Sequence, residues 1–269
     1  MARTVRIMGI FNVTPDSFSD GGCWNSERGI EERVEQLLSE GADLIDVGGE
    51  STRPGSPRVS VEEELRRVLP ALRAIRRRSD IPVSIDTYKA DVARAALEAG
   101  ATIINDIGAL RLDSAMVELL CSSSAQVVVM HMQGVPEDMQ ESPHYRDVVA
   151  EVNAFFSERI AFLGERGVEK ERIILDPGIG FGKTLAHNLA LLRHIPVFRE
   201  HGCPVLIGHS RKTFLGELLD LSVEERDWPT AQVSSFCARQ GADILRVHNV
   251  RATQLALRLD AALQGELVV

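Results

Sequence analysis

Eight short apolar runs rich in β-branched residues recur along the chain, and segments with helical spacing separate most of them. The runs predict strands at approximately 5–11, 83–85, 102–104, 126–130, 172–175, 204–207 and 243–247, together with one that stops at residue 46. Each run ends on a polar residue, in chain order Asn12, Asp46, Asp86, Asn105, His131, Asp176, Ser210 and Arg246. This order predicts an α/β protein, a single (β/α)8 TIM barrel, in which the strand C-termini and the long loops after them form one face. We therefore expect the polar residues to converge on that face.

The segments between the runs carry signals for the starts and ends of helices. Ser60 and Glu63 form the pattern of a capping box, and an apolar stripe follows as far as Ile75. Gly-Ala pairs at 41–42, 100–101 and 241–242 each stand between a helical segment and a strand, where glycine can adopt the left-handed conformation that ends a helix. Three connections after strands, approximately 12–25, 48–59 and 132–145, have lengths typical of lids or binding loops.

Composition limits the classes of protein that the chain can represent. Its 269 residues are close to the length typical of one barrel, so we expect a single domain over residues 1–269. A net charge of -9 argues against general binding to nucleic acid or to an anionic membrane. The cysteines lack paired spacing, and no apolar stretch is long enough for a membrane helix, so we expect reduced thiols and a cytoplasmic protein.

The segment 176–183, with the sequence Asp-Pro-Gly-Ile-Gly-Phe-Gly-Lys, has two interpretations. Successive glycines let backbone N–H groups approach a phosphate without obstruction by side chains. The spacing is not that of a Walker A motif, and a tight turn of the barrel explains the glycines equally well.

Two carboxylates and one amide follow strongly apolar strands. Asp86 and Asp176 are expected at a partly buried mouth of the barrel, where each needs hydrogen-bond donors. The ring N–H and amine groups of a heterocycle, a protein arginine or a helix N-terminus would each supply them. Asn105 can donate and accept along the edge of the same heterocycle, or it can cap the next helix.

Cationic residues follow the seventh and eighth strands, a common place for an anion site in this architecture. Arg246 and His248 lie two residues apart and should point to the same face, opposite to Val247. We expect them to bind a phosphate-like anion. Lys212 is a second candidate for a ligand contact, whereas Arg211 is expected to pair with an acidic neighbour.

The loop after the first strand is rich in oxygen ligands. Asn12 and the Ser, Thr and Asp residues of 14–20 fit a Mg2+ site that is shared with substrate phosphates, although such loops usually form turns. His131 and Met130 fit either the core or a ligand site. The seven histidines lack the local spacing of zinc ligands.

Taken together, these motifs resemble those of the dihydropteroate synthases over approximately residues 7–250. The resemblance rests on the segments 12–22, 46–55, 176–183, 210–212 and 246–248. It implies that the chain joins 6-hydroxymethyl-7,8-dihydropterin diphosphate to p-aminobenzoate, giving 7,8-dihydropteroate and diphosphate. It also implies a Mg2+ cofactor and a homodimer.

The resemblance further implies a role for individual residues. The pterin diphosphate would be bound by Thr52, Asp86, Asn105, Asp176, Lys212, Arg246 and His248, with Met130 beneath the ring. The p-aminobenzoate pocket would contain Thr52, Pro54, Phe181 and Ser210. The catalytic residues would be Asp16, Arg53 and Lys212, and Asn12 would contact the metal. The chain departs from the family pattern at Pro229, where glycine is frequent, and at Asn249, where aspartate is frequent.

Three other functions are compatible with parts of this pattern. A methyltransferase-like pterin-binding domain would need no diphosphate pocket, so Arg246 and His248 favour the synthase. A noncatalytic pterin-binding paralogue would bind the ligand without releasing diphosphate. An unrelated phosphate-binding barrel would not bind pteroic-acid-like compounds.

Overall fold

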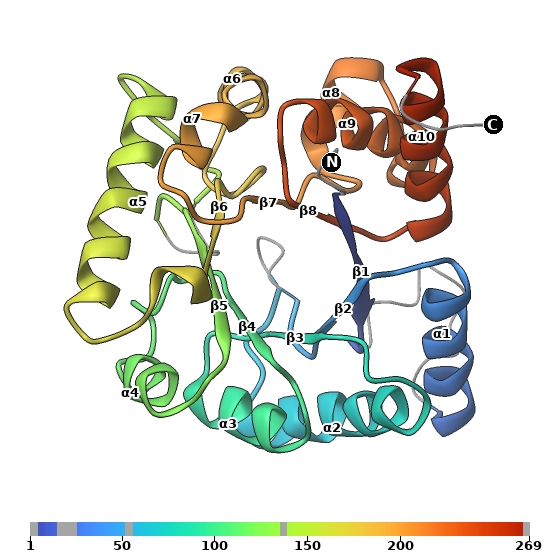
Figure 1. The fold of residues 1–269 in the computed structure, drawn as a ribbon, viewed down its shortest axis with the longest axis vertical. Helices are drawn as coiled ribbons and strands as arrows, with labels where there is room; N and C mark the ends of the chain where they lie inside the picture. The colour runs from blue at the N-terminus through green and yellow to red at the C-terminus, as the bar shows by residue number, and fades with distance from the viewer. Residues whose placement is uncertain (1–4, 15–25, 52–55, 135–138, 266–269) are drawn as a thin grey trace.

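The eight strands are parallel and form a nearly closed barrel (Figure 1), which confirms the predicted fold class. The computed structural model describes residues 5–14, 26–51, 56–134 and 139–265. The strands are β1 (Arg6–Asn12), β2 (Leu44–Gly48), β3 (Val83–Asp86), β4 (Ile103–Asp106), β5 (Gln126–Met130), β6 (Ile173–Asp176), β7 (Leu206–Ile207) and β8 (Ile244–Val247). Their order in the sheet is β6-β5-β4-β3-β2-β1-β8-β7, and a single bridge between Leu175 and Val205 joins the two edges.

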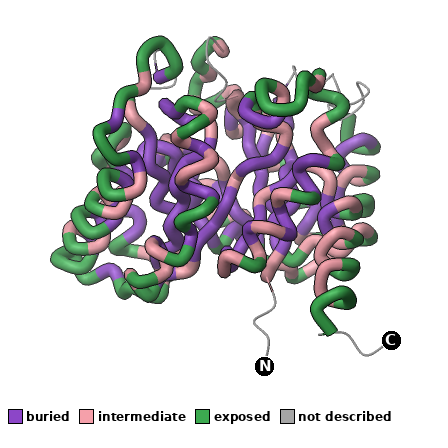
Figure 2. Tube along the Cα trace, turned by 90° about the horizontal axis from the view of Figure 1, so that it is seen from above, coloured by how far each residue is buried: buried purple, intermediate pink, exposed green. Residues whose placement is uncertain are grey.

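Helices surround the strands on the outside of the barrel (Figure 1). They are α1 (Glu27–Ser39), α2 (Val61–Arg78), α3 (Ala90–Glu98), α4 (Ala115–Ser122), α5 (Val148–Gly164), α6 (Leu185–Arg193), α7 (Ile195–Arg199), α8 (Thr213–Leu219), α9 (Asp227–Arg239) and α10 (Val250–Leu263), with short 3-10 turns at Lys170–Arg172 and Val223–Arg226. Figure 2 shows the buried residues gathered in the centre of the molecule and the exposed ones on the outer helix surfaces.

The barrel interior is filled by one apolar side chain from each strand except β3. These side chains form one buried cluster of Met8, Leu44, Ile103, Val128, Ile174, Leu206 and Ile244. Because side chains alternate along a strand, their neighbours in sequence point outwards and pack against the helices in a second, larger cluster. The interior is therefore a packed apolar layer rather than a channel.

The predicted helix ends are confirmed in two respects and wrong in a third. Gly41, Gly100 and Gly241 have φ values of +86°, +100° and +92°. Ser60 caps α2 by accepting a hydrogen bond from the Glu63 N–H at 3.3 Å. The reciprocal half of the capping box does not form, because the Glu63 carboxylate binds two arginines further along the helix instead.

Two further observations concern thiols and helices. Cys121, Cys203 and Cys237 are free thiols, and the last two are buried. Over the described ranges, no helix is both long enough and apolar enough to cross a membrane.

Candidate active site

The periodicity of the strands brings the polar residues together at the C-terminal mouth of the barrel. The interior residues Leu44, Ile103, Ile174 and Ile244 are each followed, two positions later, by Asp46, Asn105, Asp176 and Arg246. Two positions along a strand return to the same face, so these polar side chains lie directly above the apolar interior layer. Strand register adds Asn12, Gly48 and Asp86, which are neighbours on β1, β2 and β3 at the level of Asn105. The mouth is therefore polar because these strands end in polar residues.

Arg246 joins two of the carboxylates directly. Its Nε donates to Asp46 Oδ2 at 2.6 Å, and its Nη2 donates to Asp86 Oδ2 at 2.6 Å. Asn105 Nδ2 also donates to Asp46 Oδ2, at 3.2 Å. Asp46 is fully buried. Burial raises the pKa of Asp86, and the Arg246 guanidinium opposes that shift. The cluster is a buried ion-pair network of which one carboxylate, Asp86, remains partly exposed at the mouth.

Asp176 lies at the mouth without an ion pair as close as those of Arg246. Its Oδ1 accepts the Gly178 N–H at 2.7 Å. A Cβ on Gly208 would lie 3.6 Å from its Oδ2, so the absence of a side chain there leaves space beside that oxygen. Burial raises the pKa of Asp176 to about 6, and the nearby charges of Lys212 and Arg246 lower it. One carboxylate oxygen is therefore fixed by the loop, while the other faces this space.

The phosphate-loop interpretation of 176–183 is not supported by the geometry. The N–H of Gly178 is used by Asp176, that of Gly180 donates to Asn188 Oδ1 at 2.8 Å, and that of Phe181 donates to Gly178 O at 3.0 Å. These three N–H groups are thus satisfied within the protein. The glycines instead serve a tight turn, as the positive φ values of +67° and +81° at Gly178 and Gly180 require.

Lys183 is a buried cation inside this turn, a position that the sequence did not indicate. Its Nζ lies 3.1 Å from His131 Nδ1 and donates to the carbonyl oxygens of His131 and Phe181 at 3.2 and 2.8 Å. Burial lowers the pKa of Lys183 to about 7 and that of His131 to about 3. The His131 ring also packs edge-on against Phe155, with centroids 5.0 Å apart. His131 is therefore a core group that accepts a hydrogen bond.

An apolar floor adjoins the polar mouth. Ile107, Met130, Met132, Met139 and Phe181 form a separate buried cluster. The Lys212 ammonium lies 4.0 Å from the centroid of the Phe181 ring, a cation–π contact. The three predicted ligand-binding residues Met130, Phe181 and Lys212 are thus grouped around one side of the mouth.

Ser210 and His248, which end on neighbouring strands, contact each other. Ser210 Oγ accepts the His248 backbone N–H at 3.1 Å and lies 2.9 Å from His248 Nδ1. Burial lowers the pKa of His248 well below its usual value, and its imidazole is therefore neutral. Since Nδ1 faces a hydroxyl that can donate to it, the ring proton is free to reside on Nε2.

The prediction for Arg211 is confirmed. Its Nε and Nη2 donate to the two Asp227 carboxylate oxygens at 2.6 and 3.0 Å. The departure from the family pattern at Asn249 lies beside this pair, because Asn249 Nδ2 donates to Asp227 Oδ2 at 3.0 Å. An aspartate could not make that bond. Pro229 lies in the first turn of α9, where its missing N–H is tolerated.

Asn12 lies at the end of β1, beside the carboxylate cluster. A Cβ on Gly48 would lie 3.5 Å from Asn12 Oδ1 and 3.7 Å from Asp86 Oδ2, so this glycine leaves the space between the two oxygens free of a side chain. Within the described part of the chain, no group of three or more His, Cys, Asp or Glu side chains is arranged to hold a metal ion. The predicted residues Asp16, Thr52, Arg53 and Pro54 lie outside the described residues.

Two features of this region are not indicated by the sequence. The sequence places Asp46 at a strand end but gives no signal for its contact with Arg246. A second network, just beyond the C-terminal ends of β2 and β3, joins Lys89 to Glu50 and Glu64. Glu64 is buried on the apolar stripe of α2. A charged residue at such a position indicates that it has a buried partner of opposite charge.

Comparison with known proteins identifies the family. The family model described as pterin binding enzyme matches residues 8–248. Dihydropteroate synthase of Escherichia coli (strain K12) is 47% identical over 253 residues, which cover 94% of this chain and 89% of that protein. The crystal structure of Yersinia pestis dihydropteroate synthase with a sulfonamide drug complex has a TM-score of 0.92 at 43% identity, covering 98% of this chain and 96% of that chain. Dihydropteroate synthase from Xanthomonas albilineans in complex with 7,8-dihydropteroate has a TM-score of 0.87 at 43% identity, covering 98% and 95%. The chain belongs to the pterin-binding enzymes and, within them, to the dihydropteroate synthase family.

Proposed function

We propose that the C-terminal mouth of this barrel performs the dihydropteroate synthase reaction. In that reaction, the methylene carbon of 6-hydroxymethyl-7,8-dihydropterin diphosphate forms a C–N bond with p-aminobenzoate, and diphosphate leaves. The observation that carries the assignment is the direct contact of Arg246 with Asp46 and Asp86, beside Asn105. This contact gathers strand ends that lie far apart in the sequence into one polar site.

The acidic and amide side chains suit the edge of a pterin ring. Asp86, Asn105 and Asp176 offer oxygen acceptors, and a pterin offers ring N–H and exocyclic amine donors. We propose that the ring lies between these groups, with Met130 beneath it and Lys212 beside it. The carboxylates also favour the positive charge that develops on the ring as the methylene C–O bond breaks.

The other end of the substrate carries the diphosphate, and we assign it to Arg246 and His248. Arg246 supplies a permanent charge, since its acidic neighbours Asp46 and Asp86 raise its pKa against the opposing effect of burial. The neutral His248 ring would donate from Nε2 while Ser210 holds Nδ1. His248 therefore contributes a directed hydrogen bond rather than a charge.

Asn12 is the residue that we assign to Mg2+. Mg2+ commonly takes one or two protein oxygens and completes its shell with water and substrate phosphates. A single amide oxygen beside Gly48, which has no side chain, fits that mode of binding. When bound, the ion neutralises part of the charge on the diphosphate.

p-Aminobenzoate is assigned to the side of the mouth near Phe181 and Ser210, with Thr52 and Pro54 completing its pocket. An aryl amine is unprotonated at neutral pH, so it needs positioning more than a strong base. Asp16 and Arg53 remain proposed catalytic residues. Exclusion of water from the site would prevent water from reacting with the cation.

A coupled diphosphate-release assay tests the function. With both substrates and Mg2+ present, we expect one diphosphate for each dihydropteroate formed, and omission of p-aminobenzoate should abolish product. Binding of the pterin diphosphate without release of diphosphate under complete conditions would identify a noncatalytic pterin-binding protein instead.

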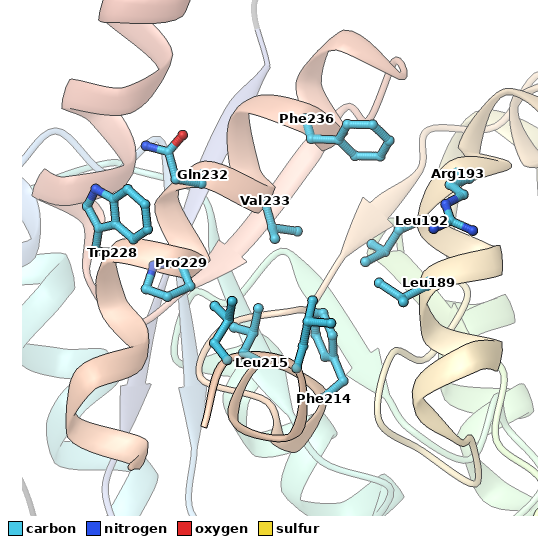
Figure 3. Close-up of a pocket in the computed structure, with 12 residues that line it drawn as sticks. Leu189, Leu192, Arg193, Phe214, Leu215, Trp228, Pro229, Gln232, Val233 and Phe236 are labelled. Atoms are coloured by element: carbon cyan, nitrogen blue, oxygen red, sulfur yellow. The ribbon is translucent and has the colours of Figure 1, made fainter. Parts of the chain in front are cut away.

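We also propose that the protein is a cytoplasmic homodimer. An apolar pocket between α6, α8 and α9 is lined by residues that include Leu189, Leu215 and Phe236 (Figure 3). Trp228, which is 70% exposed, and Leu218, which is 51% exposed, also line it. A second copy of the chain would cover this face. Light scattering should give a molecular mass twice that of one chain. In Trp228→Asp the measured mass should fall to that of a single chain.

A further inference from the structure

The ammonium group of Lys89 is surrounded by three acceptors just beyond the C-terminal ends of β2 and β3. Lys89 lies just before α3, and its Nζ donates to a carboxylate oxygen of Glu50, to Glu64 Oε2 at 2.6 Å and to the Val59 carbonyl oxygen at 2.5 Å. The exposed fractions of the side chains are 15% for Lys89, 8% for Glu50 and 1% for Glu64. Tyr88 OH donates to the other oxygen of Glu50 at 2.9 Å. The network is thus largely withdrawn from solvent.

Two of these acceptors belong to the two ends of one connection. Glu50 follows β2, and Val59 precedes α2, so a single ammonium group holds the beginning and the end of the segment 50–59 together. A second contact closes the same segment further out, where the hydroxyl oxygens of Ser51 and Ser56 are 2.9 Å apart. Glu64, on α2, anchors Lys89 to the body of the barrel.

We propose that Lys89 is a positioning residue for p-aminobenzoate binding. Because it binds both Glu50 and Val59, it would fix the two ends of the connection to which the proposed function assigns contacts with p-aminobenzoate. This inference rests on the proposed function for the role of that connection. The clamp itself is independent of it, because the contacts of Lys89 are made to residues outside 52–55.

The chemistry of lysine suits this role. An ammonium group has three donors and no acceptor, and here three oxygens from three separate parts of the chain surround it. Burial raises the pKa of Glu64, while the hydrogen bond and the charge of Lys89 oppose that shift, so the lysine favours the charged form of this carboxylate. An apolar side chain at position 89 would release the segment and leave two carboxylates facing each other.

The test uses the full-length protein and a variant with an unchanged net charge. Lys89→Met combined with Glu64→Gln removes one positive and one negative charge, so that Glu50 is the one carboxylate of this network left, with its hydrogen bond from Tyr88 OH. We expect KM for p-aminobenzoate to rise at least about tenfold, with the dissociation constant for pterin diphosphate within about twofold of wild type. Backbone amides of 50–59 should exchange with solvent at least about tenfold faster. Lys89→Arg, which keeps charge and donors, should recover most of both properties.

Arg76→Met is the matched control. Arg76 also ties segments together by donating to three carbonyl oxygens, of Ser79, Ile81 and Gly100, but at the opposite end of the barrel. Its loss should leave KM for p-aminobenzoate and the exchange of 50–59 unchanged. If the double variant does not fold, Lys89→Gln is measured by the same criteria.

Two outcomes would overturn the proposal. One is a KM for p-aminobenzoate within twofold of wild type in the folded variant. The other is a parallel rise for both substrates, which would mean that the network supports the mouth as a whole. Amide exchange is measured without substrates, so unchanged exchange rejects the clamp even if the wild-type protein makes no dihydropteroate. Absence of that product in the wild type would reject the proposed function instead.

Discussion

The two ends of the barrel use charged side chains in different ways. At the N-terminal end of the strands, charges bind the backbone: Asp43 Oδ2 accepts the Ile7 N–H and Asp243 Oδ2 accepts the Val205 N–H, both at 2.8 Å. Arg172 likewise donates to two backbone carbonyl oxygens, at 2.9 and 2.7 Å. Each of these contacts satisfies a strand or a connection that would otherwise leave a polar group unpaired.

At the C-terminal mouth, some charged side chains such as Lys183 also bind the backbone, but others bind one another. Arg246 holds Asp46 and Asp86, and Lys89 holds Glu50 and Glu64. A buried pair of this kind contributes little net stability, because desolvation offsets the attraction, but it fixes the geometry of the groups that face a ligand. The difference shows that charged residues at the N-terminal end stabilise the backbone of the barrel, whereas those at the C-terminal end position the side chains that would contact a ligand.

Arg246→Met should have the largest effect on function. Without the guanidinium group, Asp46 and Asp86 face each other uncompensated, at a cost of about 3 to 5 kcal/mol in the free energy of unfolding. Turnover should fall about a thousandfold, since the site loses both its geometry and its diphosphate contact. Denaturant unfolding and the coupled assay measure the two effects. Turnover close to that of the wild type would contradict the assignment of Arg246 to the active site.

Asp176→Asn should weaken pterin binding and turnover by about 10- to 100-fold, because hydrogen bonds to a charged acceptor contribute about 1.5 to 3 kcal/mol. Stability should change less than with Arg246→Met, since Asp176 has no ion pair as close as those of Arg246. Calorimetric titration with the pterin diphosphate measures the first effect. Equal affinity in the variant and the wild type would contradict the assignment of this carboxylate to the ring.

Pterin binding should weaken below about pH 6. Burial raises the pKa of Asp176 to about 6, and the protonated carboxyl is a poorer acceptor for ring N–H groups. Affinity should therefore fall about tenfold for each pH unit below that value, and the part of this dependence that comes from Asp176 should be lost in Asp176→Asn. Folding stability has the opposite sign: the contribution of this group is fully present below about pH 4 and is lost as the pH rises through about 6. An identical profile in both proteins would contradict the prediction.

Arg76→Met should have the smallest effect on function and a clear effect on stability. Loss of its hydrogen bonds leaves backbone carbonyl oxygens without that donor, at a cost of about 1 to 3 kcal/mol. The value of kcat/KM for both substrates should stay within about twofold of wild type. A large fall in kcat/KM would contradict the different roles assigned to the two ends of the barrel.

Most of the fold could be predicted because strand periodicity and helix-ending signals are local. The expected strand at 126–130 coincides with β5, and the Gly-Ala pairs end helices as expected. Strand β7 is shorter than predicted, with only Leu206 and Ile207, since Pro204 has no N–H and the N–H of Val205 donates to Asp243. Helix α2 continues to Arg78, beyond the apolar stripe, where basic residues favour a helix C-terminus.

The site could be predicted only in part, because its contacts join distant residues. The strand ends indicated which side chains meet, but the pairing of Arg246 with Asp46 and Asp86 spans 200 and 160 residues. Lys89 has the sequence context of an ordinary surface lysine, and only the folded chain brings Glu50 and Glu64 to it.

The central claim is that the strand ends of β3, β4 and β6 bind the pterin. A crystal structure of the protein with 7,8-dihydropteroate tests it most directly. We expect the pterin ring within hydrogen-bond distance of Asp86, Asn105 and Asp176, with the aminobenzoate part towards Phe181. Product bound elsewhere, for instance in the apolar pocket between α6, α8 and α9, with those three side chains free of ligand, would contradict the account.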